Sequence, residues 1–428
     1  MNPASANERA IEPSGIERST GAAWQPTFRI HGSQRIALLA TDGDRRTRRA
    51  GDRSELMTRM DLFADFRLSE TERIHAHLRP LDKKGRYAGT TYTPSSARAG
   101  WEIDWDSDFE ALYFEGDLGE MFPLPDLQDR ESGDFGFAVG RLPVTYQNGY
   151  LVKDDMTAVR LTRTGIGMDE PSGIRIAGLW AFDDINKPSG RADNGDVHAL
   201  MLSAEGGFPW GTLELDIGHI FSREKRGNQV NAGIGWTGGV ARDVYSVRAN
   251  VSNHYDQSEI TGKVDDFDGV LLVARYQTEF GVNHNRLYGR GFWAEGNFGR
   301  LADDGRVPPL GPIGLSYAGV GFGGYRSALW SRPLDAAGAA LGVQLFFSEK
   351  KTNWTIELAH RRDLEPADAF GDTGGVALNT RLKHRLLDFL TVQVDAYYAV
   401  LKSDGGRPQD AETDDDSSAA RVELRIDF

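Results

Sequence analysis

The chain has 428 residues, a formal net charge of −14 at pH 7 and no cysteine. Its mean hydropathy is −0.45, and no apolar run approaches the roughly 18 residues of a membrane helix, so transmembrane helices are excluded. The lack of cysteine excludes disulfides, thiolate metal sites and cysteine nucleophiles, and the acidic balance argues against a nucleic-acid partner, whose phosphates need a basic face.

The chain begins with a polar segment, residues 1–24, rich in Pro, Ser, Gly and Glu. We expect it to be a flexible periplasmic segment that precedes a single domain over residues 25–428. No apolar leader follows Met1, so the chain is expected to be a mature form without a signal peptide.

From Thr27 onward the sequence predicts repeated β-strands. The clearest example runs from Leu56 to Leu68, where apolar side chains alternate with charged ones, and a second alternating segment over 73–79 follows a short turn at 69–72. Alternation with a period of two places the apolar residues on one face of a strand. Two such strands joined by a short turn form a hairpin.

The same alternation recurs along the rest of the chain. It is found at 174–182, 213–217, 230–236, 245–252, 272–280, 354–359, 376–383 and 390–398. Strands of about 9–13 residues match the length that crosses a bilayer at a tilt, whereas strands of soluble proteins average about 5–6 residues. Aromatic residues lie near many strand ends, as in the girdles of membrane barrels.

The connections between these segments alternate loosely between short turns and long polar loops. The long loops are expected at 82–107, 183–196, 255–267, 299–312, 363–374 and 401–418. This alternation is typical of a barrel with short periplasmic turns and long extracellular loops.

The last segment ends in an aromatic residue at the C-terminus. Val422, Leu424, Ile426 and Phe428 share one face, opposite Arg421, Glu423, Arg425 and Asp427. A final strand closed by Phe resembles the closing strand of bacterial outer-membrane β-barrels. That resemblance implies a location in the outer membrane of a Gram-negative bacterium.

The number of strands follows from parity. Segmentation yields an odd number of candidates, whereas a barrel with both termini in the periplasm needs an even number. The error lies between residues 286 and 352, where the Gly-rich stretch 319–324 blurs the alternation. We predict an all-β fold, a single antiparallel transmembrane barrel of about 18 strands, with 16 as the alternative.

The polar face of each strand lines the interior of such a barrel. The basic residues predicted there, as pore-lining and substrate-contact residues, are Arg59, Arg67, Arg73, Arg79, Arg160, Arg175, Arg248, Arg275, Arg361, Arg381 and Lys383. The planar guanidinium fork suits carboxylate or phosphate. Two interpretations stay open: paired ladders of Arg and Asp or Glu that only stiffen the wall, or a cationic conduit for an anionic solute.

Residues 134–163 are the least ordinary part of the sequence. Gly136, Ala138 and Gly140 put only small side chains on one face, which leaves room for an infolded segment. With the stretch 117–122 before it, this segment resembles the alginate-export family of outer-membrane barrels.

The resemblance to the alginate-export family implies a monomeric 18-stranded barrel with an Arg-rich pore for an anionic polysaccharide. Arg141, Arg160 and Arg163 match the basic residues of the family's motif, and Asp154 and Asp155 match its acids. Strand parity, however, places Arg141 and Arg163 on the lipid-facing side.

Other patterns predict less. His75 and His77 share a face with Arg73 and Arg79 and are interpreted as polar lumen groups rather than metal ligands. The acidic stretch 410–418 lacks the glycine and spacing of an EF-hand and is interpreted as a solvated loop. No GxSxG or HExxH motif occurs, so we expect no enzyme activity, no metal and no cofactor.

The sequence therefore predicts an outer-membrane channel that passes anionic solutes passively, in its sharper version an acidic uronate polysaccharide. The alternatives are a general diffusion porin for small nutrients and a structural barrel that sheathes a periplasmic partner. The expected partners are outer-membrane lipid, lipopolysaccharide and the solute, with no nucleic acid, and a monomer is expected.

Overall fold

The computed structural model describes most of the chain. The described residues are 16–17, 23–24, 26–42, 53–69, 71–81, 90–93, 100–121, 135–166, 173–186, 197–222, 227–255, 267–319, 322–365, 373–402 and 415–428. The predicted N-terminal segment therefore lies mostly outside them; within it, Ile16–Glu17 (β1) pairs antiparallel with Ala23–Trp24 (β2). The predicted loop 410–418 is described only from residue 415, where the last strand begins.

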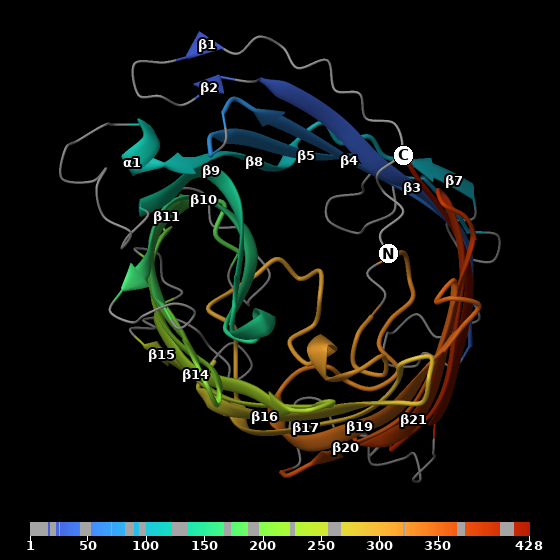
Figure 1. Ribbon diagram of the computed structural model, residues 1–428. Coiled ribbons are helices and arrows are strands. Elements are labelled where there is room, and N and C mark those ends of the chain that lie inside the picture. Colours follow the sequence, from blue (N-terminus) through green and yellow to red (C-terminus); the bar gives the residue numbers. More distant parts are fainter. Residues whose placement is uncertain are drawn as a thin grey trace.

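The chain forms a closed antiparallel β-barrel of 18 wall strands, as predicted (Figure 1). The wall strands are β3 (Thr27–Asp42), β4 (Arg53–Arg67), β5 (Arg73–Leu81), β8 (Phe109–Asp117), β9 (Phe135–Tyr146), β10 (Val152–Ile166), β11 (Ile174–Asp183), β12 (Val197–Phe208), β13 (Gly211–Ser222), β14 (Asn228–Val240), β15 (Asp243–Tyr255), β16 (Gly269–Phe280), β17 (Asn285–Asn297), β19 (Leu334–Phe347), β20 (Thr352–Asp363), β21 (Gly375–Leu387), β22 (Leu390–Leu401) and β23 (Asp415–Asp427). The last strand closes the wall by pairing with the first, from Ser418 opposite Asp42 to Asp427 opposite Ser33.

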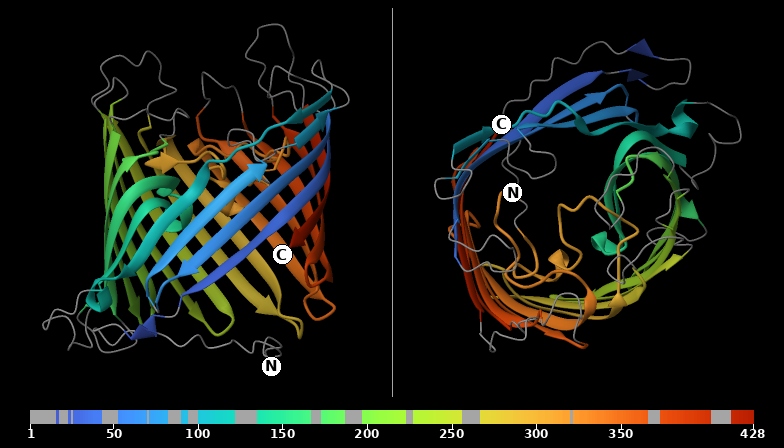
Figure 2. Two further views of the ribbon diagram at one scale, coloured as in Figure 1. Left: turned by 90° about the horizontal axis from the view of Figure 1, so that it is seen from above. Right: turned by 180° about the vertical axis from the view of Figure 1, so that it is seen from behind.

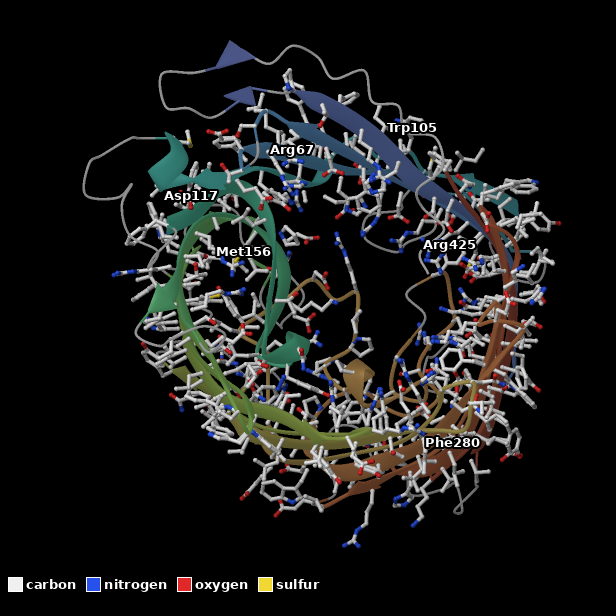
Figure 3. The ribbon with its side chains drawn as sticks, in the orientation of Figure 1. Arg67, Trp105, Asp117, Met156, Phe280 and Arg425 are labelled. Atoms are coloured by element: carbon white, nitrogen blue, oxygen red, sulfur yellow. The ribbon has the colours of Figure 1, made fainter. Side chains whose placement is uncertain are left out.

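The two faces of the wall have opposite polarity. Leucine, isoleucine and valine side chains such as Leu202, Ile217 and Leu358 are exposed on the outer face, and the inner face carries most of the charged side chains. Figure 3 shows Phe280 on the outer side and Arg67 and Arg425 on the inner side. Within the described residues, no helix is long and apolar enough to cross a membrane.

Most connections at the end where β3 begins and β23 ends, here called the terminal end, are short turns. The connection between β8 and β9 is the exception to the predicted pattern, because it spans 118–134 and starts with a short helix, α1 (Leu118–Met121). The opposite end, here called the loop end, carries most of the longer connections (Figure 2). There β6 (Thr90–Thr93) and β7 (Gly100–Ile103) extend the wall beside β4.

The β9–β10 hairpin, residues 142–156, leaves the wall and bends into the barrel (Figure 1). Pairing between β8 and β9 stops at Leu112 opposite Arg141, and pairing between β10 and β11 starts only at Thr157 opposite Asp183. Gly140 lies at the departure point with φ of 127°, a backbone conformation that side-chain-bearing residues rarely adopt. The tip of the hairpin, with the 3-10 turn η1 (Gln147–Gly149), therefore reaches the interior.

The inner loop, residues 298–333 without the undescribed positions 320 and 321, is the second segment inside the barrel. It includes β18 (Ala302–Asp303), which pairs parallel with Val152–Lys153 of the hairpin, and the 3-10 turn η3 (Gly311–Ile313). The extra strand that the sequence suggested between 286 and 352 is this loop, and the alternative of 16 strands is wrong. The predicted loop 299–312 is correspondingly too short.

Both infolded segments cover apolar patches on the inner face. The hairpin packs Leu142, Val144 and Met156 against small or apolar inner residues of β11 to β13, such as Ala181 and Ala199. The inner loop packs its own apolar side chains against the walls of β3, β4, β16, β17 and β19 to β23, where alanines recur on the inner face at Ala336, Ala340, Ala359, Ala377 and Ala399. The interior is thus partly a packed core rather than an empty tube.

Buried charged side chains hold the inner loop in place. Glu357 of β20 is 1% exposed, and its carboxylate accepts hydrogen bonds from the backbone N–H of Leu315 (3.0 Å) and Ser316 (2.8 Å) and from the hydroxyl of Tyr288 (2.8 Å). Arg361, four residues further along β20, donates to the carbonyls of Trp330, Arg332 and Leu334. Wall side chains therefore supply the backbone partners that the loop lacks in itself.

Gly140 offers a test of the hairpin's departure from the wall. A Cβ at Gly140 would collide with the carbonyl oxygen of Leu112, whereas a Cβ at Gly136 on the same strand would meet nothing within 4 Å. We expect Gly140→Ala to lower the free energy of unfolding by about 1–3 kcal/mol, measured by urea unfolding in lipid vesicles. Gly136→Ala is the matched control, and equal stabilities of the two variants would contradict this account.

Glu357 offers a test of the loop anchor. Glu357→Ala removes the acceptor of two backbone N–H groups, so we expect it to expose the inner loop to protease and to lower the unfolding free energy by about 2 kcal/mol or more. Thr355→Ala, on the same inner face of β20, should leave protease resistance unchanged. Resistance of the Glu357 variant equal to that of the control would show that the loop does not depend on this carboxylate.

Candidate functional site in the barrel interior

A network of charged side chains joins the wall at β4 and β5. Asp61 accepts hydrogen bonds from Nε and Nη2 of Arg59, both at 2.8 Å, and from Nε of Arg79 at 2.8 Å. Nε2 of His77 lies 3.3 Å from the same carboxylate. The alternation of strands β4 and β5 places all four side chains on the inner face.

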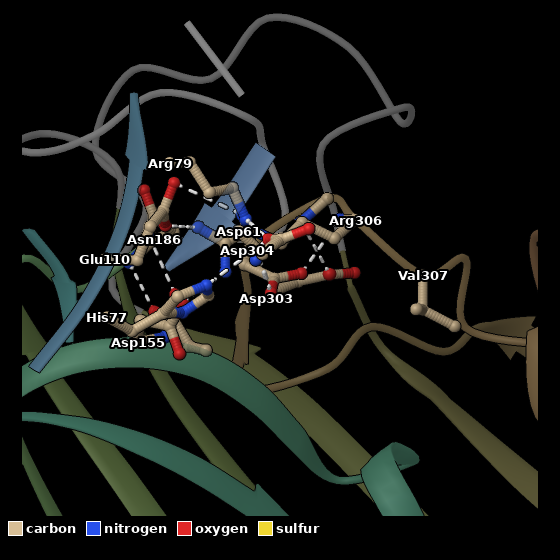
Figure 4. Close-up of polar contacts among 12 residues, drawn as sticks. Asp61, His77, Arg79, Glu110, Asp155, Asn186, Asp303, Asp304, Arg306 and Val307 are labelled. Carbon is tan, nitrogen blue, oxygen red and sulfur yellow. Dashed lines mark hydrogen bonds and ion pairs between the residues drawn. The ribbon is translucent and has the colours of Figure 1, made fainter. Parts of the chain in front are cut away.

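Arg306 of the inner loop connects this network to the hairpin (Figure 4). Its guanidinium forms ion pairs with Glu110 of β8 and Asp155 of β10, and its Nε lies 3.6 Å from a carboxylate oxygen of Asp304. Glu110 also lies 3.2 Å from Nη1 of Arg79. One arginine from the loop therefore links the wall, the hairpin and the loop.

A pocket of about 310 Å³ opens between these elements, within the size range of small-ligand sites. Its lining has cationic groups, carboxylates and apolar surface from the hairpin and the inner loop. Asp304 lies in this lining, and burial raises the pKa of its carboxyl above the ordinary value, against the lowering effect of the hydrogen bond from the Arg306 N–H. The pocket is thus a partly desolvated site with both signs of charge.

A second cluster lies where the hairpin tip meets η3 of the inner loop. Arg275 of β16 and Arg290 of β17 are directly opposite each other in the sheet register. Arg275 donates to the hydroxyl of Tyr150 at 2.7 Å, and both guanidiniums point to the carbonyl of Pro312, at 3.5 Å and 3.1 Å. Among the described residues, no carboxylate lies within ion-pair distance of either guanidinium.

Neutral groups hold this arginine pair in place. Tyr150 is completely buried, and burial raises the pKa of its hydroxyl, which therefore stays neutral. The guanidinium of Arg275 lies 5.2 Å from the Tyr150 ring centre, and that of Arg290 lies 4.7 Å from the Tyr288 ring centre. Cation–π contacts and carbonyl acceptors stabilise a cation without cancelling its charge.

The residues predicted to line the pore differ in their surroundings, although the sheet register places them on the inner face. Arg59, Arg79, Arg175 and Arg381 pair with carboxylates, and Arg67 donates to the Ser69 carbonyl. In the part of the chain that the structure describes, no carboxylate forms an ion pair with Arg73, Arg160 or Lys383. For the whole predicted set, a role in lining a pore or contacting a solute stays a prediction.

Two of the predicted residues lie beneath the infolded segments. Arg361 is 1% exposed and binds the inner loop, and Arg248 is 2% exposed and pairs with Glu214 at 2.8 Å close to the hairpin tip. Arg361 therefore holds the inner loop in place, and Arg248, beside Gln147 of the hairpin tip, is too deeply buried to face open lumen. Outside the predicted set, Arg141 lies 4.0 Å from Asp184 and Arg163 lies over the ring of Phe135.

Sequence reasoning missed three basic residues of the two clusters, Arg290, Arg306 and Lys153. Arg290 lies on β17, where glycines at 289 and 291 weaken the alternation that would have marked it. Arg306 and Lys153 belong to infolded segments, whose position the strand pattern does not report. The recurring alanines on the inner face were the available signal, because a lumen filled only with water has no need of small apolar side chains.

The described residues contain no group of three or more His, Asp or Glu that could hold a metal ion. His75 and His77, the histidines considered as ligands, instead contact Asp65, Glu115 and Asp61. Both therefore act as polar lumen groups in this structure.

Comparison with known proteins gives a fold but no sequence family. No family model and no curated protein matches the sequence. Among solved structures, Pseudomonas aeruginosa OccK5 (OpdH) is similar with a TM-score of 0.51 and 11% identity over 94% of this chain and 98% of that one. Acinetobacter baumannii OccAB4 is similar with 0.55 and 9% over 96% and 100%. A BenF-like porin from Pseudomonas fluorescens Pf-5 is similar with 0.57 and 8% over 94% and 99%.

The chain therefore has the fold of outer-membrane β-barrel porins. A closed barrel satisfies all its strand hydrogen bonds, and its apolar outer face suits lipid, which together place it in the bacterial outer membrane. The narrower resemblance to the alginate-export family finds no support among these structures, one of which is described as a porin.

Arg306 is the residue to test in this network. Arg306→Ala removes the link between wall, hairpin and loop. The carboxylates of Glu110, Asp155 and Asp304 then lose their contact with this arginine. We expect a higher single-channel conductance in planar bilayers and a shift toward cations, because both the bulk and the charge of the arginine are lost. Arg326→Ala, an exposed position on the same loop, is the control. Conductance and selectivity equal to wild type would refute a role for Arg306 in the conduction path.

Proposed function

We propose that this protein is an outer-membrane channel through which small anionic solutes diffuse. The observation that carries the proposal is the pair of Arg275 and Arg290, whose inward-facing charges meet no carboxylate among the described residues. Two like charges directly opposite each other in a sheet are destabilising. The repulsion between these two arginines, which have only neutral partners, is relieved when a passing anion supplies the missing negative charge.

The size of this effect is adequate for selectivity. A unit anion about 4 Å from a guanidinium gains about 4 kcal/mol at an effective dielectric constant of about 20, before its own desolvation is subtracted. A site of this kind attracts anions and yet releases them, as conduction requires.

The infolded hairpin and loop favour small solutes over a polymer. Both occupy the interior near the arginine pair, and the loop is held by buried charges at several points along its length. Pseudomonas aeruginosa OpdK, a similar structure (TM-score 0.53, 9% identity, covering 94% of this chain and 98% of that one), was solved with vanillate, which is a small carboxylate. The uronate polysaccharide of the sharper sequence hypothesis has less support.

A general diffusion porin for small nutrients is the second candidate. Many of the inner arginines are paired with carboxylates, such as Arg59 with Asp61 and Arg381 with Asp395, and paired charges select weakly. The two candidates differ in ion selectivity, since only the first needs a clear preference for anions.

Reversal potentials in planar bilayers test the proposal. We expect wild type to prefer chloride over potassium and expect Arg275→Glu combined with Arg290→Glu to reverse or abolish that preference. Lys350→Glu with Lys351→Glu, in the turn between β19 and β20, makes the same change in net charge outside the lumen and should have little effect.

Three other results would count against the proposal. Equal shifts in the two double variants would remove the arginine pair from the conduction path. A non-selective wild-type channel would favour the diffusion porin. Absence of any conductance would favour a structural barrel.

A further inference from the structure

We infer that the pocket beside Arg306 is a binding subsite for a small zwitterion that carries both an ammonium and a carboxylate group, such as an aliphatic α-amino acid. The inference rests on the proposed channel function for its biological meaning, but the pocket itself is a separate place from the arginine pair. It lies between the wall at β4 and β5, the β9–β10 hairpin and residues 304–307 of the inner loop.

The pocket presents two charged groups of opposite sign, the ammonium of Lys153 and the carboxylate of Asp304, which do not form an ion pair with each other. The ammonium group of Lys153 forms no ion pair with any described residue, although its backbone carbonyl accepts the N–H of Asp304 at 2.9 Å. Asp304 has one oxygen bonded to the Arg306 N–H at 2.8 Å, while its other oxygen reaches the Arg306 guanidinium only at 3.6 Å. Two neighbouring residues therefore offer a cation and a carboxylate to the same space.

The remaining charges of the lining select against ions of a single sign. A simple carboxylate that approaches Lys153 also meets Asp155 and Asp304, and a simple amine meets Lys153, Arg79 and Arg306. A zwitterion can align its carboxylate with the cations and its ammonium with the carboxylates, so that both contacts are favourable in a partly desolvated site.

The apolar part of the lining indicates the rest of the ligand. Pro143, Val144 and Val307 contribute to the pocket, and a volume of about 310 Å³ is at the lower end of the range for small-molecule sites. An aliphatic side chain of a few carbons fits this surface, whereas a long charged side chain would add an unmatched charge.

Three matched solutes test the ligand class. L-Leucine has both charged groups, 4-methylpentanoate lacks the ammonium group and 3-methylbutylamine lacks the carboxylate, while the carbon skeleton is nearly constant. We expect leucine to reduce the single-channel current in a saturable way and to bind the purified protein in calorimetry. Its half-saturating concentration should be at least about tenfold lower than that of either analogue, which corresponds to about 1.4 kcal/mol.

Two variants test the assigned residues. Lys153→Met and Asp304→Asn should each weaken leucine binding at least about fivefold, while Lys350→Met in the turn at 348–351 should not. Folding of each variant is checked by its shift on unheated gels. Retained leucine affinity in folded Lys153→Met and Asp304→Asn variants would overturn the inference, as would equal affinity for leucine and its analogues.

The two measurements separate this inference from the proposed function. If the wild type carries no current, the channel proposal fails, and calorimetry still decides whether leucine binds. If the wild type conducts anions but binds leucine no better than its analogues, the channel proposal stands and the zwitterion subsite is wrong.

Discussion

The interior of this barrel depends on one constraint: the infolded backbone must find hydrogen-bond partners that no strand supplies. A barrel wall pairs its own N–H and C=O groups, but of the described residues of the inner loop only the two of β18 join the sheet. An unpaired polar group in a dry interior is costly. Wall side chains meet this need, since Glu357 accepts loop N–H groups, Arg361 donates to loop carbonyls and Glu55 accepts the N–H of Gly324.

This constraint changes the meaning of charge inside the barrel. In an open pore, an arginine on the inner face is expected to line the path of the solute. Arg361 and Arg248, however, are almost completely buried and bind parts of the protein itself. The charged groups that a solute can contact are those with only neutral partners, as at Arg275 and Arg290. Groups whose charge is not fully paired, as at Lys153 and Asp304, are available as well. Burial and pairing, rather than the number of inner arginines, therefore indicate where a solute can bind.

Local pattern was enough to predict the wall, and long-range contact explains what it could not predict. The period of two identified most strands, the closing strand and the inner face, because each depends only on residues two positions apart. It failed within β17, where glycines at 289 and 291 weaken the alternation, and in the apolar inner loop that follows β17.

The candidate site was harder to predict than the wall. Arg306 pairs with Glu110 and Asp155, which are 196 and 151 residues away in the chain, and nothing in the local sequence specifies such a contact. The small residues at 136, 138 and 140 did signal that something folds inward. They did not reveal that the hairpin they belong to is one of the infolded segments, because that requires the φ of 127° at Gly140.

The inner loop couples the two candidate binding places. Arg306 borders the pocket, and the carbonyl of Pro312, six positions later, receives both Arg275 and Arg290. η3, which includes Pro312, is followed after Gly314 by Leu315 and Ser316, whose N–H groups donate to the carboxylate of Glu357. A displacement of the loop at Glu357 would thus move the acceptor that keeps the arginine pair in position and would change the pocket through Arg306. Because one anchored segment sets the geometry of both places, the proposed selectivity depends on the loop's anchoring as much as on the charges of the wall.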